Sequence, residues 1–334
     1  MIRSWYRTAK NIALSATLIC LATLPAHAAD PVKIGVNIWI GTAPFYVADA
    51  LDLYKKYNTS VKLRFFNDLA LVPPAMASGG LDGGVLTYDM VVANVARNMK
   101  QRVVMPVDYS NGGDAILASK EITKITDFKG KKVAFNPLSP SDFLLSYALK
   151  SNGMSEKDIK PVNMGAEAVA AAMASGGVPI GVTYQPSISE IEKIDGGKKL
   201  HVVYSSKEAP GLITDVLVFN QKFIDAHPAE VKAVIQGYLD ALAYMKSNPD
   251  EAVKHIAKAM KLKPEEVKEQ FPDVFNLPLA DMPKVFAKSK DTMSFHTTTQ
   301  VIGELLKSKK QIKAIPAVEN TYDDQFVKAL IAGK

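Results

Sequence analysis

The chain is almost without cysteine. Its 334 residues contain one, Cys20, which lies in an apolar stretch near the N-terminus. The sequence after residue 28 therefore has no thiol for a disulfide, a cysteine-ligated zinc or iron–sulfur site, or nucleophilic catalysis. A fold without disulfides depends on its hydrophobic core, and a chain of roughly 300 residues is long enough to build one.

Arginine is nearly as scarce after residue 28, where only Arg64, Arg97 and Arg102 remain. Arginine is the side chain that best clamps a carboxylate or phosphate with two parallel hydrogen bonds. All three lie on or beside predicted strands and are expected at the surface. An anionic ligand is therefore expected to be held by backbone N–H groups and hydroxyls.

Familiar catalytic motifs are also absent. The sequence has no Gly-x-Ser-x-Gly elbow, no phosphate-binding Gly-Lys-Ser/Thr loop and no dinucleotide fingerprint. The histidines after residue 28 are far apart, and none has metal-ligand spacing. The formal net charge of +6 is carried largely by lysines spread over predicted helices, which does not indicate nucleic-acid binding. We therefore expect no enzyme activity, no cofactor, no metal and no nucleic-acid partner.

The N-terminal residues have the pattern of a secretory signal peptide. Basic residues precede an apolar stretch over 12–24, and Ala26-His27-Ala28 fits a small-x-small cleavage site. Residues 1–28 are therefore predicted to be removed on export. Export without disulfides favours a bacterial periplasm. A lipid anchor at Cys20 stays open, although Ile19 stands where a lipidation site normally has a small residue.

Strand and helix patterns alternate along the chain, with a break near residue 110. Everything beyond Phe219 is expected to be helical, most clearly residues 228–247, whose apolar residues form one stripe. The expected strands are 32–39, 61–65, 85–86, 102–107, 115–118, 132–135, 161–164, 181–182, 201–204 and 212–219.

This order predicts an α/β protein with two lobes, each a mixed sheet flanked by helices, joined by two hinge strands. Strands that alternate with helices at this spacing favour parallel pairing. The first lobe is expected over 30–110 and 216–334, and the second over 111–215. Hinges are expected near 108–115 and 211–218, where they would let the lobes close over a ligand.

One unit occurs twice, about a hundred residues apart. Met76-Ala77-Ser78-Gly79-Gly80 leads through a short strand to Thr87-Tyr88-Asp89, and Met173-Ala174-Ser175-Gly176-Gly177 leads to Thr183-Tyr184-Gln185-Pro186. Each copy predicts a helix end, a Gly-Gly turn and a buried strand. Ligands of open α/β sheets bind beyond the carboxyl ends of the strands. The repeat therefore predicts two half-sites, one in each lobe.

Polar helix starts follow several of the strands. In Ser139-Pro140-Ser141-Asp142, Ser139 can cap the helix, and Ser141 lies near free N–H groups that suit an anion. Thr42 and Thr87 offer the same arrangement. Trp39 and Tyr184 are candidate aromatic walls, with core packing as the alternative for both.

Longer motifs resemble one family throughout the chain after the signal peptide. They are Trp39-Ile40-Gly41-Thr42-Ala43-Pro44-Phe45, Ser110-Asn111-Gly112-Gly113-Asp114, Asp127-Phe128-Lys129-Gly130-Lys131-Lys132-Val133-Ala134, Phe143-Leu144-Leu145, Val162-Asn163-Met164 and Pro210-Gly211-Leu212-Ile213. Together they resemble the periplasmic substrate-binding proteins of ABC importers for nitrate, sulfonate and taurine, a group that includes thiamine-precursor binders. The resemblance implies a type II-like clamshell. It also implies that the protein docks on a membrane permease driven by a cytoplasmic ATPase and so contacts the inner membrane peripherally. We expect a monomer.

The resemblance also implies a pocket between the lobes. Its residues would be Trp39, Thr42, Thr87, Asn111, Asp114, Ser139, Ser141, Thr183 and Asp215, to which the repeat ends add Tyr88, Tyr184 and Gln185. Members often carry Glu-Pro where this chain has Gln185-Pro186. If that Glu holds an amine, its replacement weakens the case for taurine or amidine ligands. Asp114 and Asp215 are alternatives for receiving an amine, although bracing the hinge is the favoured role.

The favoured function is capture of a small anionic or zwitterionic solute, with an organosulfonate first, for delivery to a permease. One alternative keeps the fold and exchanges the cargo for a thiamine-type aminopyrimidine stacked on Trp39 and Tyr184. Two more functions on the same fold stay open, an enzyme and a sensory module. The question of cargo is expected to rest largely on Gln185.

Overall fold

The structure, a computed structural model, describes residues 30–333. The predicted signal peptide over 1–28 and Cys20 lie outside the described residues. Among the residues that are described, no helix is both long and apolar enough to span a membrane.

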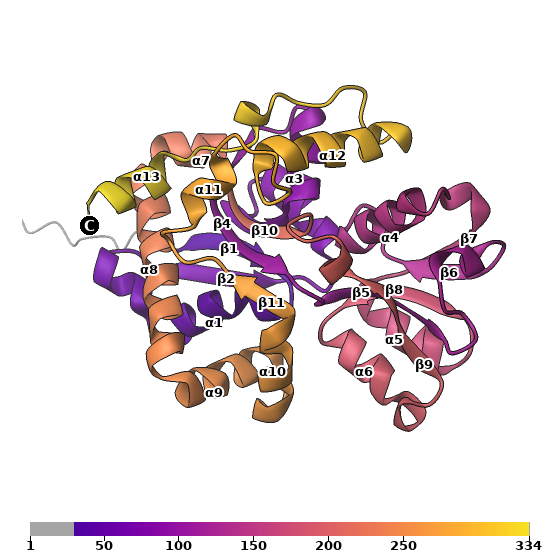
Figure 1. The fold of residues 1–334 in the computed structure, drawn as a ribbon. Helices are drawn as coiled ribbons and strands as arrows, with labels where there is room; N and C mark the ends of the chain where they lie inside the picture. The colour runs from indigo at the N-terminus through magenta and orange to yellow at the C-terminus, as the bar shows by residue number, and fades with distance from the viewer. Residues whose placement is uncertain (1–29, 334) are drawn as a thin grey trace, which may run out of the picture. The chain divides into compact units, whose positions relative to one another are not determined.

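A six-stranded sheet forms the centre of the first lobe (Figure 1). β1 pairs in parallel with β2 and β3, whereas β10 runs antiparallel to both β3 and β4. The expected parallel pairing therefore holds for only part of a mixed sheet. In spatial order the strands are β11 (Val274–Asn276), β4 (Gln101–Ser110), β10 (Thr214–Asn220), β3 (Gly83–Thr87), β1 (Val32–Val36) and β2 (Val61–Phe65).

A five-stranded sheet forms the second lobe on the same plan. β6 pairs in parallel with β7 and β8, and β5 runs antiparallel to β8 and β9. A mixed sheet in each lobe, flanked by helices, agrees with the predicted fold class. The spatial order is β7 (Lys160–Asn163), β6 (Lys132–Phe135), β8 (Ile180–Tyr184), β5 (Asp114–Ser119) and β9 (Leu200–Ser205).

The sequence repeat occupies equivalent places in the two sheets. Its copies are α2 (Val72–Ala77) with β3, and α5 (Ala166–Ala174) with β8. β3 and β8 each end a parallel trio and pair on their other side with the antiparallel strand. Gly79 and Gly176, just past the two helices, have φ values of 77° and 72°, a conformation that glycine adopts without strain.

The chain crosses between the lobes twice. It leaves the first sheet after β4, through residues 111–113, and returns between β9 and β10, through residues 206–213. The predicted hinge at 108–115 spans the first crossing. The predicted hinge at 211–218 shares only residues 211–213 with the second crossing, because β10 already begins at Thr214.

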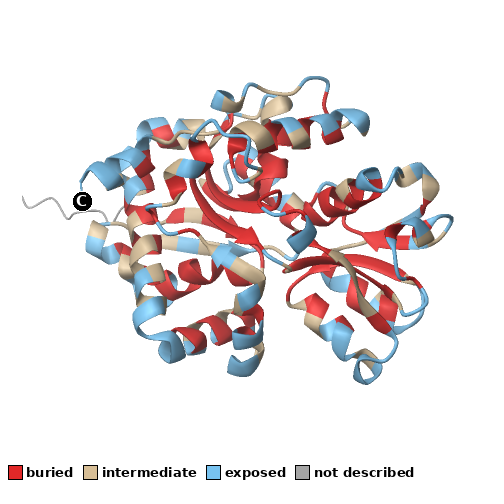
Figure 2. Ribbon diagram, in the orientation of Figure 1, coloured by how far each residue is buried: buried red, intermediate tan, exposed pale blue. Residues whose placement is uncertain are grey.

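Helices cover both sheets, and the central strands and inner helix faces are buried (Figure 2). The helix expected over 228–247 is confirmed as α8, which packs on α1. The expectation that everything after Phe219 is helical is wrong at β11, a strand of three residues and thus too short to show alternation. The remaining helices are α1 (Ala43–Ala50), α3 (Tyr88–Ala96), α4 (Pro140–Ser151), α6 (Ser187–Lys193), α7 (Gln221–Ala226), α9 (Pro249–Met260), α10 (Pro264–Gln270), α11 (Met282–Phe286), α12 (Phe295–Ser308) and α13 (Gln325–Ala332).

Tyr88 fastens α3 to α12 inside the first lobe. Its hydroxyl lies 2.7 Å from Thr299 Oγ1 and 2.8 Å from Thr321 Oγ1, and its ring stacks on Phe295 with centroids 3.8 Å apart. Tyr88→Phe removes the buried hydroxyl to which both threonine hydroxyls are hydrogen-bonded. We expect the free energy of unfolding in urea to fall by about 1–2 kcal/mol.

The matched control is Tyr322→Phe. The Tyr322 ring also contacts Phe295, but its hydroxyl makes no hydrogen bond within residues 30–333. This control should change the free energy of unfolding by less than about 0.5 kcal/mol. Equal effects of the two substitutions would contradict the assigned role of the Tyr88 hydroxyl.

Candidate functional site

A small cavity lies where the carboxyl ends of parallel strands in the two lobes face each other. Five of the predicted site residues line it: Trp39, Thr87, Asp114, Tyr184 and Asp215. Its volume of about 10 Å³ leaves room for about one water molecule. The lobes are therefore closed around this space.

Strand register places the two acids of the lining. Asp215, near the start of β10, lies opposite Thr87 at the end of β3, and Asp114, at the start of β5, lies opposite Tyr184 at the end of β8. An antiparallel strand begins at the edge where its parallel neighbours end. Each lobe therefore contributes one carboxyl group beside the end of its repeated unit.

Most of the predicted hydroxyls are already engaged elsewhere. Thr42 Oγ1 donates to the Trp39 carbonyl (2.7 Å), Ser139 Oγ to the Asn136 carbonyl (2.7 Å), and Thr183 Oγ1 to the Ala166 carbonyl (3.0 Å). None of these three residues lines the cavity. They brace the turns that surround it.

Two predicted hydroxyls remain free. Thr87 Oγ1 and Ser141 Oγ are buried and make no well-formed hydrogen bond among residues 30–333, although the Thr87 hydroxyl is close enough to the Asp89 carboxyl to lower its pKa. Thr87 is the N-cap of α3, and Ser141 lies in the first turn of α4, directly after the cavity-lining Pro140. The first N–H groups of a helix carry partial positive charge and lack intrahelical acceptors. These two helix starts therefore offer donors suited to an anion.

Three buried carboxyl groups belong to the site: Asp114 and Asp215 line the cavity, and Asp108 accepts from the cavity-lining Trp39. Asp108, Asp114 and Asp215 are 0%, 3% and 6% exposed, and none of them belongs to an ion pair formed by the described residues. Burial raises the pKa of Asp108 and of Asp114 to about 7. Burial and the neighbouring acids Asp108 and Asp114 raise the pKa of Asp215 well above its usual range. A cation bound here would stabilise the ionised carboxyl groups.

Trp39 and Tyr184 form an aromatic wall. Their rings meet edge to face, with centroids 6.3 Å apart, and Trp39 Nε1 donates to Asp108 Oδ1 (3.3 Å). Two glycines make room for the indole: a Cβ at Gly41 would lie 2.3 Å from Trp39 Nε1, and one at Gly113 would lie 2.3 Å from Trp39 Cη2. This packing gives a physical reason for glycine in the two motifs that contain these positions.

Three predicted residues point elsewhere. Tyr88 belongs to the first-lobe core, and Asn111 Nδ2 donates to the Pro272 carbonyl (3.1 Å) on an exposed turn. Gln185 Nε2 donates to Asp273 Oδ2 (2.9 Å), and its Oε1 accepts from Ser189. Gln185 does not line the cavity, so the absence of a Glu there carries no argument against an amine.

Sequence reasoning missed four residues of the lining: Asn37, Leu69, Pro140 and Ile213. Asn37 directly follows β1, at the strand edge where ligands of such sheets bind, and that rule would have found it. Leu69 and Ile213 are apolar residues in connections, for which the sequence carries no comparable signal.

A family model described as NMT1/THI5 like matches residues 39–252. Among curated proteins, the taurine-binding periplasmic protein of Escherichia coli (strain K12) is 26% identical over 325 residues, covering 93% of this chain and 96% of the relative. Several solved structures share the fold. The periplasmic aliphatic sulphonate-binding protein SsuA from Escherichia coli has a TM-score of 0.70 and 19% identity, covering 87% of this chain and 97% of that one. The periplasmic nitrate-binding protein NrtA from Synechocystis PCC 6803 has a TM-score of 0.69 and 13% identity, covering 91% and 88%.

The raised pKa of Asp114 predicts a stability that falls with pH. In the unfolded chain this carboxyl ionises near pH 3.8, but in the folded protein it stays protonated until about pH 7. Between these values the folded state binds more protons than the unfolded state, so the free energy of unfolding decreases as the pH rises. Asp114→Asn removes the titrating group and with it this decrease in the free energy of unfolding. Measured by urea unfolding, the difference in free energy of unfolding between variant and parent should rise in the variant's favour by at least about 1 kcal/mol from pH 4 to pH 7.5.

Glu192→Gln is the control, because Glu192 is an exposed acid on α6. Its unfolding free energy should run parallel to that of the parent over the same pH range. A parallel course for Asp114→Asn as well would show that this acid does not titrate abnormally.

Proposed function

The chain belongs to the NMT1/THI5-like family, and on that premise we propose that it is the periplasmic solute-binding component of an ABC import system. We propose a small aminosulfonate of the taurine type as its solute. The observation that carries this proposal is that one cavity brings together the hydroxyl of Thr87 at a helix start and two acids without a basic partner, Asp114 and Asp215. A zwitterion complements both kinds of group.

In the proposed complex the sulfonate faces Thr87, Ser141 and the N–H groups of the first turn of α4. The ammonium group faces Asp114 and Asp215. The methylene groups between them lie against the Trp39 and Tyr184 rings. A sulfonate lacks a donor of its own, so it satisfies the two unpartnered hydroxyls without competing for the acids.

Capture requires the lobes to separate first, because the cavity as it stands holds about one water molecule. The crossings at 111–113 and 206–213 are the proposed hinges, with lobes at the predicted boundaries. A solute that contacts both lobes favours a form closed around it and so shifts the population from the open form towards that closed complex. The closed protein would then deliver the solute to a membrane permease with its cytoplasmic ATPase. We propose that it acts as a monomer and catalyses no reaction.

The aminopyrimidine alternative has one observation in its favour. The Trp39–Tyr184 pair could stack on a flat ring whose exocyclic amine donates to Asp215. This alternative gives the hydroxyls at the two helix starts no anionic acceptor, because an aminopyrimidine carries no anionic group.

A matched set of ligands tests the proposal by titration calorimetry: taurine, ethanesulfonate, nitrate and 4-amino-2-methylpyrimidine. Taurine should bind tightest, and ethanesulfonate, which lacks only the amine, at least about tenfold more weakly, since charge-assisted hydrogen bonds contribute about 1.5–3 kcal/mol. Asp215→Asn should abolish most of that difference. Binding of the pyrimidine alone would overturn the proposed solute in favour of the alternative.

Two serines on the same helix start test the anion side. Ser141→Ala removes a free hydroxyl and should weaken taurine and ethanesulfonate alike by roughly tenfold. Ser139→Ala removes a hydroxyl already bonded to Asn136, so it should lower the thermal midpoint and leave both affinities within about twofold. Equal losses of affinity in the two variants would indicate that the helix start, rather than the Ser141 hydroxyl, is what binding requires.

A further inference from the structure

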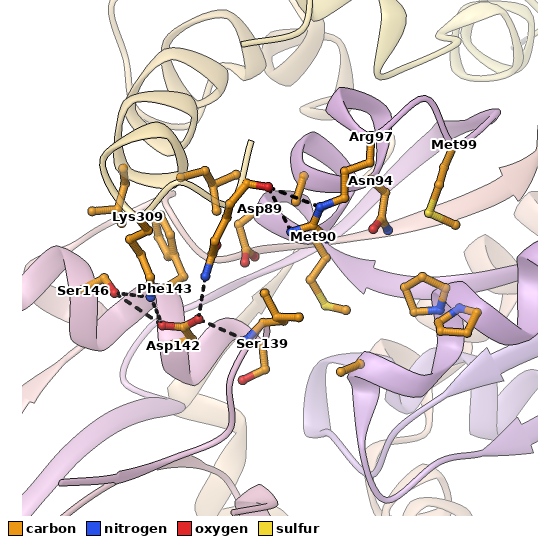
Figure 3. Close-up of a pocket in the computed structure, with 18 of the residues that line it drawn as sticks. Asp89, Met90, Asn94, Arg97, Met99, Ser139, Asp142, Phe143, Ser146 and Lys309 are labelled. Atoms are coloured by element: carbon orange, nitrogen blue, oxygen red, sulfur yellow. Dashed lines mark hydrogen bonds and ion pairs between the residues drawn. The ribbon is translucent and has the colours of Figure 1, made fainter. Parts of the chain in front are cut away.

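A second, larger cavity lies beside the first, between α2, α3 and α12 of the first lobe and α4 of the second (Figure 3). Its volume is about 350 Å³, within the usual range of small-molecule sites. It is a separate space in the closed protein and shares no lining residue with the central cavity.

Most of its lining is apolar. Pro73 and Pro74 form one wall, Ala93 and Leu306 a second, and Phe143 of the opposite lobe a third. An apolar cavity of this size between helices is suited to a ligand with an apolar body. The ligand would contact both lobes.

Two buried polar atoms in the lining have no partner. Asp89 Oδ1 and Asn94 Nδ2 belong to side chains that are 5% and 6% exposed, and neither atom makes a hydrogen bond within the described part of the chain. Both residues line the cavity, as Figure 3 shows. A buried polar atom left unpartnered costs about 1–3 kcal/mol, which a ligand that pairs with it would recover.

Of the other charged groups of the lining, only Lys309 and Asp142 form an ion pair among residues 30–333. Lys309 Nζ contacts Asp142 and Glu156, and Arg97 donates through Nη2 to the Gln311 carbonyl (3.3 Å). Asp89 is thus the only carboxylate of this lining without a basic partner among residues 30–333. Burial raises its pKa to about 6, so it is still ionised at pH 7.5. Hydrogen bonds from the Thr87 hydroxyl and from the N–H groups of Asp89 and Met90 partly offset this rise in pKa, but no basic side chain pairs with the carboxylate among residues 30–333, so it can still receive a cation.

We propose that this cavity binds a small organic amine, with the ammonium group on Asp89, an apolar body between the helices and a hydrogen-bond acceptor on Asn94. The two residues are five positions apart on α3, which is about 7.5 Å along the helix axis. A ring with a two-carbon amine arm covers a comparable distance. The proposed site is separate from the proposed aminosulfonate site and does not depend on it.

Two probes each lack one group of tyramine: 2-phenylethylamine lacks the hydroxyl acceptor, and 4-ethylphenol lacks the amine. In calorimetry at pH 7.5 tyramine should bind tightest and 4-ethylphenol at least tenfold more weakly. Asp89→Asn should weaken tyramine at least tenfold and leave 4-ethylphenol within twofold. Asn94→Ala should bring tyramine to the affinity of 2-phenylethylamine.

A pair of variants from the sequence repeat separates loss of binding from loss of folding. Ala77→Phe places a ring at the exposed edge of the cavity and should weaken all three probes. Ala174→Phe is the equivalent change in the second copy of the repeat, on an exposed site that does not line this cavity, and should change nothing. Absence of tyramine binding at millimolar concentration would overturn the proposal. So would weakening by Asp215→Asn but not by Asp89→Asn, which would place the amine in the central cavity.

Discussion

Each sheet of this protein incorporates a strand that arrives from the other lobe and runs against its parallel neighbours. β10 enters the first sheet from the second lobe, and β5 enters the second sheet from the first. An antiparallel strand must begin where the parallel strands end, so Asp215 meets Thr87 and Asp114 meets Tyr184. The same constraint places the two chain crossings next to the site. The position of the central cavity thus follows from topology, and its chemistry from the residues that begin and end these strands.

Burial of the three acids limits what the cavity can hold. A carboxylate removed from water without a cation is strongly disfavoured, which is why burial raises the pKa values of Asp108 and Asp114. Both groups would ionise more readily if a cation were bound beside them. A purely anionic solute would meet this side as a repulsive surface unless the acids were protonated. A zwitterion converts the same acids into partners. In the proposed complex the acids would therefore discriminate among sulfonates more than the hydroxyls, because every sulfonate presents the same oxygens to Thr87 and Ser141.

The sequence predicts those features that depend on local signals. Strand ends, helix starts and the repeated unit are encoded within short windows, which is why Trp39, Thr87 and Tyr184 could be placed at the cavity. Whether a hydroxyl is free is a different matter. Ser139 and Ser141 are two positions apart, yet only Ser139 has an acceptor in reach, the Asn136 carbonyl. That difference depends on rotamers and on the path of the preceding loop, which no pattern of residue types expresses.

Long-range contacts explain the remaining difference between expectation and structure. Gln185 reaches Asp273, 88 residues away, at the strand β11 that sequence patterns did not reveal. This hydrogen bond links the two lobes, as do the contact of Asn136 with Asp68 (2.8 Å) and the ion pair of Lys309 with Asp142. All three must break when the lobes separate. Because Gln185, Asn136 and Asp142 are buried, the proposed opening would exchange these contacts for contacts with water, and a bound solute would shift the balance towards the closed form. On the proposed mechanism, position 185 would therefore affect the closure equilibrium, whereas the choice of solute would rest with the cavity residues.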